Sequence, residues 1–142
     1  MNNKIYLFLF ILITASCGVT KDLHSKPIFR YVDLYQYGKI ELGQDISKFD
    51  SLLEKNGDHK FLKQNVFGGS ESIQLVQNSQ GKISAIIFSY GNETDLRSKI
   101  KDYQYLGKPK IEKKNASWTD GKTLYEVYVE NQIVYAKMTD LL

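Results

Sequence analysis

An uninterrupted apolar run near the start of the chain decides which residues are left to build a fold. The run extends from Ile5 to Ile13 (IYLFLFILI), after the cationic Lys4, and the small residues 14–16 follow it. A helix needs ~20 apolar residues to cross the hydrocarbon core of a bilayer, and this run is roughly half as long. Its length and flanks are typical of a secretory signal peptide. We therefore expect residues 1–16 to be a signal peptide and the fold to be built from the rest of the chain.

Cys17, the only cysteine, directly follows these small residues. The stretch Ile13-Thr14-Ala15-Ser16-Cys17 resembles the cleavage site of bacterial lipoprotein signal peptides, with Thr14 where an aliphatic residue is usual. The resemblance implies lipidation at Cys17, with a diacylglyceryl thioether and an acylated amino group, and two or more acyl chains hold a protein stably on a membrane. A lone cysteine also lacks a partner for an intramolecular disulfide. The alternative is a plain secretory signal that is cut near Ser16 and leaves Cys17 free.

The residues after Cys17 predict where the domain would be held. Residues 18–27 have no periodicity, so residues 17–27 are interpreted as a lipidated tether. Ten residues reach at most ~33–36 Å when extended, which would keep the domain close to the bilayer. Gly18 does not match the aspartate that, by the same resemblance, marks inner-membrane retention in enteric bacteria. The expected location is therefore the cell envelope, with the outer membrane favoured and the membrane as first partner.

Length and composition fit a single folded domain over residues 28–142. The chain is 42% hydrophobic and 25% charged, as is ordinary for a globular protein. A segment of this length has room for one core. The formal net charge of +3 is too small to indicate a nucleic-acid partner.

Alternation of apolar and polar residues predicts strands over most of this domain. Asp120-Gly121 is the strongest hairpin-turn signal. Two helices are also expected. The first covers roughly Ser47 to Lys55 and stops at Asn56-Gly57, and the second starts at Asn92 and ends before Gly107. The expected strands are 28–37, 61–67, 72–78, 83–90, 110–118, 122–129 and 132–138.

The two halves of the domain share an organisation at an offset of fifty-one positions. Residues 67–73 resemble residues 118–124, and Phe49 falls on Ile100. Each half is therefore predicted to contain a helix followed by three strands, which gives possible repeats at residues 40–90 and 91–140. We therefore predict an α+β fold of two α-β-β-β units, with the helices packed on one face of a mainly antiparallel sheet.

The turns and helix ends of this pattern carry a second resemblance. Ile40-Glu41-Leu42-Gly43 precedes the first expected helix, Gly81-Lys82-Ile83 lies in the first set of strands, and Leu106-Gly107-Lys108-Pro109 ends the second helix. In these features the domain resembles the SmpA/OmlA-type outer-membrane assembly lipoproteins and the tandem-repeat β-lactamase inhibitor proteins. The resemblance implies a protein-binding role at the envelope.

Histidine is too scarce to predict a catalytic or metal site. His24 falls in the tether and His59 in the loop after the first expected helix. Asp58-His59 offers two metal ligands, with no third at a recognisable spacing. The glycines do not form a phosphate-binding loop. We predict no catalytic residue, metal, cofactor or small-molecule substrate, and an enzyme would have to combine His59 with an acid and a serine.

Basic side chains between positions 97 and 114 form the first candidate contact surface. They outnumber the acids Asp102 and Glu112 and could attract anionic lipid head groups or an acidic partner, although a solvated face is the ordinary alternative. The basic candidates are Arg97, Lys101, Lys108, Lys110, Lys113 and Lys114.

Aromatic side chains form the second candidate surface. Tyr and Trp dominate protein-binding hot spots, but they also pack well on half-buried sheets. Because alternate strand residues face opposite sides, Tyr125 and Tyr128 cannot both lie in the core of a regular strand. The aromatic candidates are Trp118, Tyr125, Tyr128 and Tyr135.

Together these patterns predict a non-catalytic, membrane-anchored lipoprotein that acts as a protein-binding or assembly module in the bacterial cell envelope. Its expected partner is another envelope protein. The alternative is an inhibitor or immunity protein that blocks a toxin or an enzyme.

Overall fold

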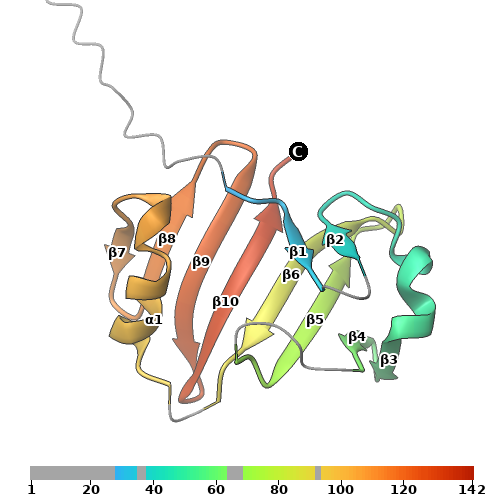
Figure 1. Ribbon diagram of the computed structural model, residues 1–142, viewed down its shortest axis with the longest axis horizontal. Helices are drawn as coiled ribbons and strands as arrows, with labels where there is room; N and C mark the ends of the chain where they lie inside the picture. Colours follow the sequence, from blue (N-terminus) through green and yellow to red (C-terminus); the bar gives the residue numbers. More distant parts are fainter. Residues whose placement is uncertain (1–27, 35–37, 64–68, 92–93) are drawn as a thin grey trace, which may run out of the picture.

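The computed structural model describes residues 28–34, 38–63, 69–91 and 94–142. The expected signal peptide, Cys17 and the tether lie outside the described residues. Within them, about half of the residues lie in ten strands that form a two-stranded and an eight-stranded antiparallel sheet (Figure 1).

The eight-stranded sheet combines both halves of the chain. Its strand order is β3-β4-β5-β6-β10-β9-β8-β7, so that each half contributes four consecutive strands. The two sets join where β6 pairs with β10, with Phe88 opposite Ala136. The strands are β3 Leu53–Asn56, β4 His59–Leu62, β5 Ser72–Gln77, β6 Ile83–Ser89, β7 Lys110–Glu112, β8 Asn115–Thr119, β9 Thr123–Glu130 and β10 Ile133–Asp140.

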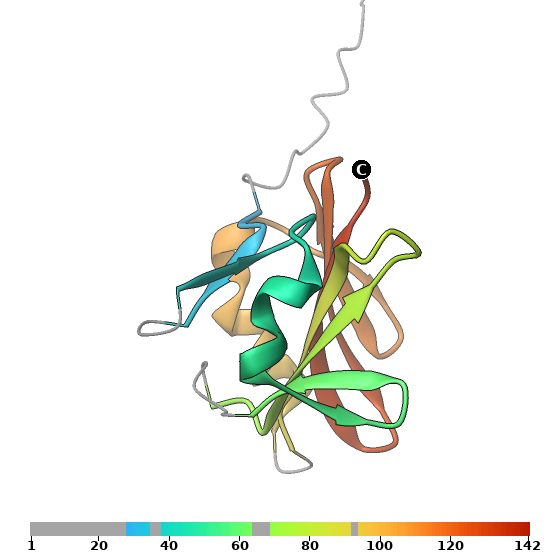
Figure 2. The same ribbon diagram turned by 90° about the vertical axis from the view of Figure 1, so that its right-hand side faces the viewer.

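Short elements cover one face of this sheet. Figure 2 shows the β1–β2 hairpin, the helix α1 and the 3-10 helix η2 on the same side of the sheet. Asp45 caps η2 by accepting a hydrogen bond from the backbone N–H of Ser47, and Asp95 caps α1 by accepting one from Ser98. The elements are β1 Tyr31–Asp33, β2 Lys39–Glu41, η2 Ile46–Leu52, α1 Leu96–Asp102 and the 3-10 helix η3 Gln104–Leu106.

The predicted α+β fold of two α-β-β-β units is wrong, because the described chain is mostly β. The expected helix over 47–55 is the 3-10 helix Ile46–Leu52, and β3 begins immediately at Leu53. Asn56-Gly57, interpreted as a helix stop, instead ends β3 at Asn56, and Gly57, with φ +61°, and Asp58 form the turn of the β3–β4 hairpin. Each helical segment is therefore followed by four strands and not three. The strand expected over 110–118 is likewise the hairpin β7–β8, whose turn contains Lys113 at φ 48°.

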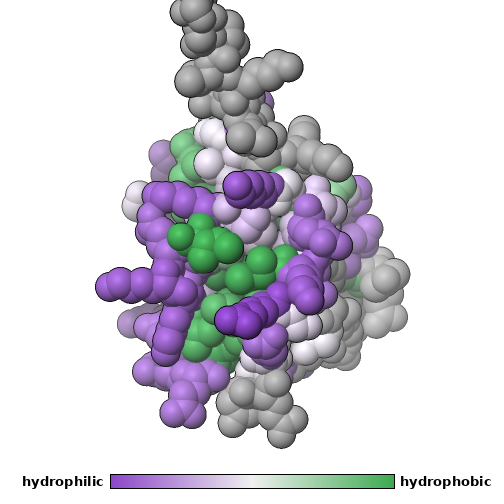
Figure 3. All heavy atoms as spheres, turned by 90° about the vertical axis from the view of Figure 1, so that its left-hand side faces the viewer, coloured by the Kyte–Doolittle hydropathy of each residue, from purple (hydrophilic) through white to green (hydrophobic). Residues whose placement is uncertain are grey.

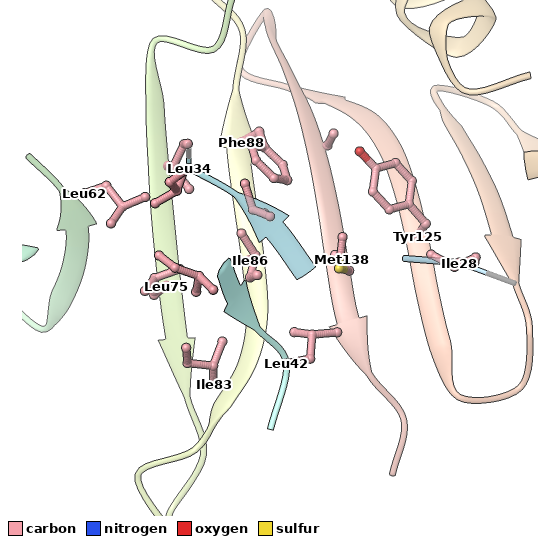
Figure 4. Close-up of a cluster of buried hydrophobic side chains, with 14 of the residues drawn as sticks. Ile28, Leu34, Leu42, Leu62, Leu75, Ile83, Ile86, Phe88, Tyr125 and Met138 are labelled. Atoms are coloured by element: carbon pink, nitrogen blue, oxygen red, sulfur yellow. The ribbon is translucent and has the colours of Figure 1, made fainter. Parts of the chain in front are cut away.

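The core lies between the large sheet and the β1–β2 hairpin. Val32, Leu34, Ile40 and Leu42 from the hairpin segment are each 4% exposed or less. Figure 4 shows Leu34 and Leu42 over inward side chains of the sheet, among them Ile86, Phe88 and Met138. Each buried residue removes its apolar surface from water, the main favourable term in folding. The hairpin is thus part of the core and not a peripheral arm.

The start of the described chain is fastened to the end of the large sheet. The backbone N–H of Ile28 donates to Asp120 Oδ2 at 2.9 Å, and Arg30 Nη2 donates to Asp140 Oδ1 at 2.8 Å. Arg30 Nη1 also donates to the carbonyl oxygen of Lys122 at 2.9 Å. Burial alone would raise the pKa of Asp120, but backbone hydrogen bonds from Ile28, Lys122 and Thr123 outweigh it and lower that pKa. These contacts join the segment ahead of β1 to the β8–β9 turn and to the end of β10.

Candidate binding surfaces

His59 and its neighbour Asp58 are exposed. His59 Nδ1 lies 2.7 Å from Gln74 Nε2, and both residues line a hollow of about 110 Å³. Asp58 lines the same hollow, but its described lining residues include no serine. Nowhere in the described ranges do three or more His, Cys, Asp or Glu residues come close enough to hold a metal ion.

Two of the four aromatic candidates, Trp118 and Tyr125, lie in the core. They are 2% and 4% exposed, and the Trp118 indole N–H donates to the carbonyl oxygen of Gly107 at 2.9 Å. The Tyr125 ring lies 4.8 Å from that of Tyr103, which follows α1. Burial raises the pKa of the Tyr125 hydroxyl well above its usual value, and the neighbouring Tyr103 adds to this effect. These two side chains position α1 and η3 on the sheet.

The other two aromatic candidates, Tyr128 and Tyr135, lie on the opposite face of the sheet. They are directly opposite each other on β9 and β10, and their rings stack with centroids 5.4 Å apart and 20° between planes. Partial burial raises the pKa of Tyr128, and the negative charges of Glu130 and Glu126 raise it further. Its hydroxyl therefore stays protonated and able to donate a hydrogen bond. The expected division of Tyr125 and Tyr128 between the two faces is confirmed.

The face that carries this tyrosine pair has no described element over it (Figure 2). Strand register brings residues from six strands into a row beside the pair. Most of the side chains on this face are half-buried, consistent with packing against their cross-strand neighbours alone. The row beside the pair consists of Phe61, Gln74, Ile87, Lys137, Glu126 and Ser117. The row that contains the pair consists of Ser72, Ser89, Tyr135, Tyr128 and Asn115.

The six basic candidates are all exposed and lie on α1 and around β7. Arg97 and Lys101 are on α1, and the other four lie between positions 108 and 114. Lys110 Nζ lies 2.6 Å from Glu112 Oε1. The hydrogen bond and charge of each partner raise the pKa of Lys110 and lower that of Glu112. Part of the basic charge expected for this surface is therefore balanced locally.

An apolar patch accompanies these basic residues. Viewed from the side of α1 and β7, the surface has a hydrophobic centre surrounded by hydrophilic side chains (Figure 3). Ile111, on the edge strand β7, is 64% exposed, and Lys110 and Glu112 flank it. Charged residues on a short edge strand discourage pairing with other chains. This arrangement can equally protect the edge or contact a partner.

A cleft opens beside β1 on the helix-bearing face of the sheet. Its volume is about 180 Å³, and aromatic side chains dominate its lining. In Figure 4, Phe88, Met138 and Tyr125 project from β6, β10 and β9 toward the side on which β1 and Ile28 lie. The described lining residues are Ile28, Phe29, Tyr31, Val32, Asp33, Phe88, Tyr103, Tyr105, Leu106, Tyr125 and Met138.

Sequence reasoning missed this cleft and the extent of the uncovered face. The cleft combines residues near positions 30, 88, 105, 125 and 138, which no spacing in the chain connects. Two residues of the uncovered face could have been found from the sequence, because alternate residues of a strand face opposite sides. Ile87 directly precedes the buried Phe88, and Phe61 directly precedes the buried Leu62.

Comparison of this chain with known proteins identifies no similar protein. No protein-family model matches this chain, and no curated protein or solved structure matches it either. Over the described ranges, no helix has the length and apolar character needed to cross a bilayer.

Proposed function

We propose that this chain is a lipid-anchored protein of the bacterial cell envelope that binds another envelope protein through the uncovered face of its large sheet. The observation that carries the proposal is the stacked pair Tyr128–Tyr135, set among Phe61 and Ile87 on a face over which no described element lies. Aromatic and apolar side chains gathered on a surface and bordered by polar ones are typical of protein interaction sites.

The two rows of this face carry no net charge, and Glu130 adds one negative charge beside Tyr128. Lys137 and Glu126 are direct neighbours across β9 and β10, so their opposite charges offset each other. The other polar residues of the two rows carry hydroxyl or amide groups, as in Gln74 and Asn115. Such groups form hydrogen bonds with a protein surface, whereas nucleic acid or anionic lipid would require an excess of positive charge.

The proposed anchor supports the same function. A lipid on Cys17 and a tether of residues 17–27 would keep the domain beside the membrane. A partner in the same membrane would then meet this face at high effective concentration, so that a modest interface would suffice for binding.

Site-specific photocrosslinking in intact cells tests the proposal. A photoreactive phenylalanine analogue at position 128 should give one dominant adduct with another envelope protein, and Tyr135→Ala should reduce its yield severalfold. The matched control places the same analogue at Lys101, an exposed residue of α1 on the other side of the domain.

The identity of the adduct separates the alternatives. An adduct specific to position 128 that contains an envelope protein supports the proposal. A toxin or a secreted enzyme in its place would favour the inhibitor or immunity function. A second copy of this chain, the same adduct from both positions, or no adduct at position 128 would contradict the proposed function.

A further inference from the structure

The cleft beside β1 has a lining suited to an organic cation. Six of its eleven described lining residues are aromatic, one is the acid Asp33, and none of the eleven is Lys or Arg. Aromatic rings attract cations through the negative potential of their faces, and a nearby carboxylate strengthens the attraction. A site for an anion would instead require cationic side chains or exposed N–H groups.

The rings of the cleft are inclined to one another. Tyr103 makes interplanar angles of 49° with Tyr125 and 50° with Tyr105, and Phe29 makes 66° with Tyr31. Parallel stacking would hide the ring faces against each other. Inclined rings can direct several faces toward one point, as recognition of a quaternary ammonium group requires.

Lysine ammonium groups lie over the ring of the lining residue Tyr31 and over the ring of Tyr90, so the face of Tyr31 that Lys39 covers is not open to a ligand. Lys39 Nζ lies 4.2 Å from the ring centre of Tyr31, and Lys99 Nζ lies 3.9 Å from that of Tyr90. The Tyr90 hydroxyl in turn lies 2.9 Å from the hydroxyl of Tyr103, a lining residue. Burial raises the pKa values of Tyr105 and Tyr125, so that their hydroxyls remain neutral. Asp33 is the one acid among the described lining residues, and it lies opposite Lys39 in the β1–β2 register.

The size of the cleft limits the ligand to a small group. Its volume of about 180 Å³ is below the ~300–1,000 Å³ of pockets that enclose drug-sized ligands. A trimethylammonium group fits this limit, whereas a nucleotide or a haem does not. From lining, ring inclination and size, we propose that this cleft binds a quaternary ammonium group, as a free cation or as the head group of a lipid.

The only tryptophan of the chain provides the readout. The Trp118 ring lies 6.4 Å from that of Tyr103 and 6.3 Å from that of Tyr125, and both tyrosines line the cleft. Titration of the purified full-length chain, in a detergent without choline, should give a saturable change in tryptophan fluorescence with choline. The uncharged isostere 3,3-dimethylbutan-1-ol should bind about tenfold more weakly, because it lacks the cation–π attraction.

Variants and vesicles complete the test. Tyr105, which is 49% exposed, can be replaced without opening the core, and Tyr105→Ala should weaken choline binding about fivefold. Tyr128→Ala, on the opposite face, is the matched control and should leave choline binding unchanged. Phosphatidylcholine vesicles that compete with choline would assign the site to a lipid head group, and failure to compete would assign it to a free cation. Equal binding of the uncharged alcohol, or no saturable response to choline, would overturn the proposal.

Discussion

Single residues at the end of the large sheet determine how the chain enters the domain. Asp120 was expected only as part of a hairpin turn, and its carboxylate also accepts hydrogen bonds from the backbone N–H groups of Ile28, Lys122 and Thr123. One side chain thus closes the β8–β9 turn and holds the segment that leads into β1.

The lowered pKa of Asp120 predicts a stability that depends on pH. The stabilisation by the charged carboxylate is complete above its unfolded-state pKa of about 3.9 and is lost as pH falls through the lower folded-state pKa. We expect Asp120→Asn to unfold at lower urea concentration than the unmodified chain at about pH 7, and the two midpoints to converge near pH 2. A constant difference across this range would contradict the role given to the charge.

At the scale of elements, the sequence predicted strands well, and the hairpin turn expected at Asp120-Gly121 is confirmed by the pairing of β8 with β9. Each expected strand segment overlaps an observed strand because period-two alternation reflects a sheet with one buried face. The segment 61–67 shares only its first two residues with β4, and residues 64–67 lie outside the described residues. The helix expected over 47–55 ends early because a glycine such as Gly57 can follow a helix or begin a hairpin turn, and only pairing with β4 distinguishes the two. The β1–β2 cover could not be predicted, since its burial depends on contacts far apart in sequence.

The expected resemblance of the two halves of the domain can be checked by comparing which face of the sheet the corresponding residues occupy. At an offset of fifty-one positions, buried Ile73 of β5 falls on half-buried Leu124 of β9, and half-buried Gln74 falls on buried Tyr125. An offset of fifty-one therefore interchanges the two faces where β5 falls on β9, whereas buried Ile83 and Ala85 of β6 fall on Val134 and Ala136, which are buried as well. The duplication of residues 40–90 and 91–140 stays a prediction.

The cover formed by β1 and β2 should contribute strongly to stability. Leu34 follows β1 and is 2% exposed, and truncation of such a buried leucine costs about 2–5 kcal/mol. We expect Leu34→Ala to lower the free energy of unfolding in urea by this amount. Leu124→Ala, at a half-buried position on the uncovered face, should cost clearly less. Equal losses from the two variants would contradict the assignment of the hairpin to the core.

At the scale of the whole molecule, the candidate surfaces occupy different sides. The large sheet separates the stacked pair Tyr128–Tyr135 from the cleft beside β1, so that one side can be altered without the other. Because alternate residues of a strand face opposite sides, the spacing of Tyr125 and Tyr128 along the predicted strand was enough to place them on opposite faces. The cleft required the fold, because β1, β6, β9, β10 and η3 contribute to it together.

The predicted lipid anchor is a property of the whole molecule, because it decides where every surface is presented. Cys17→Ala should remove the acceptor of the lipid and leave the precursor unprocessed. The measurement is incorporation of radioactive fatty acid together with the electrophoretic size of the chain. Labelling should be lost and the larger form retained, whereas normal processing of the variant would contradict the lipoprotein prediction.

The fastening of Ile28 and Arg30 has a mechanical consequence. A pull on the chain ahead of Ile28 would act first on Asp120, Lys122 and Asp140, which border the long paired strands β9 and β10. Load would thus pass into the middle of the eight-stranded sheet and not only into the three-residue β1. A domain held by its leading end would in this way resist extension through its broadest hydrogen-bonded part.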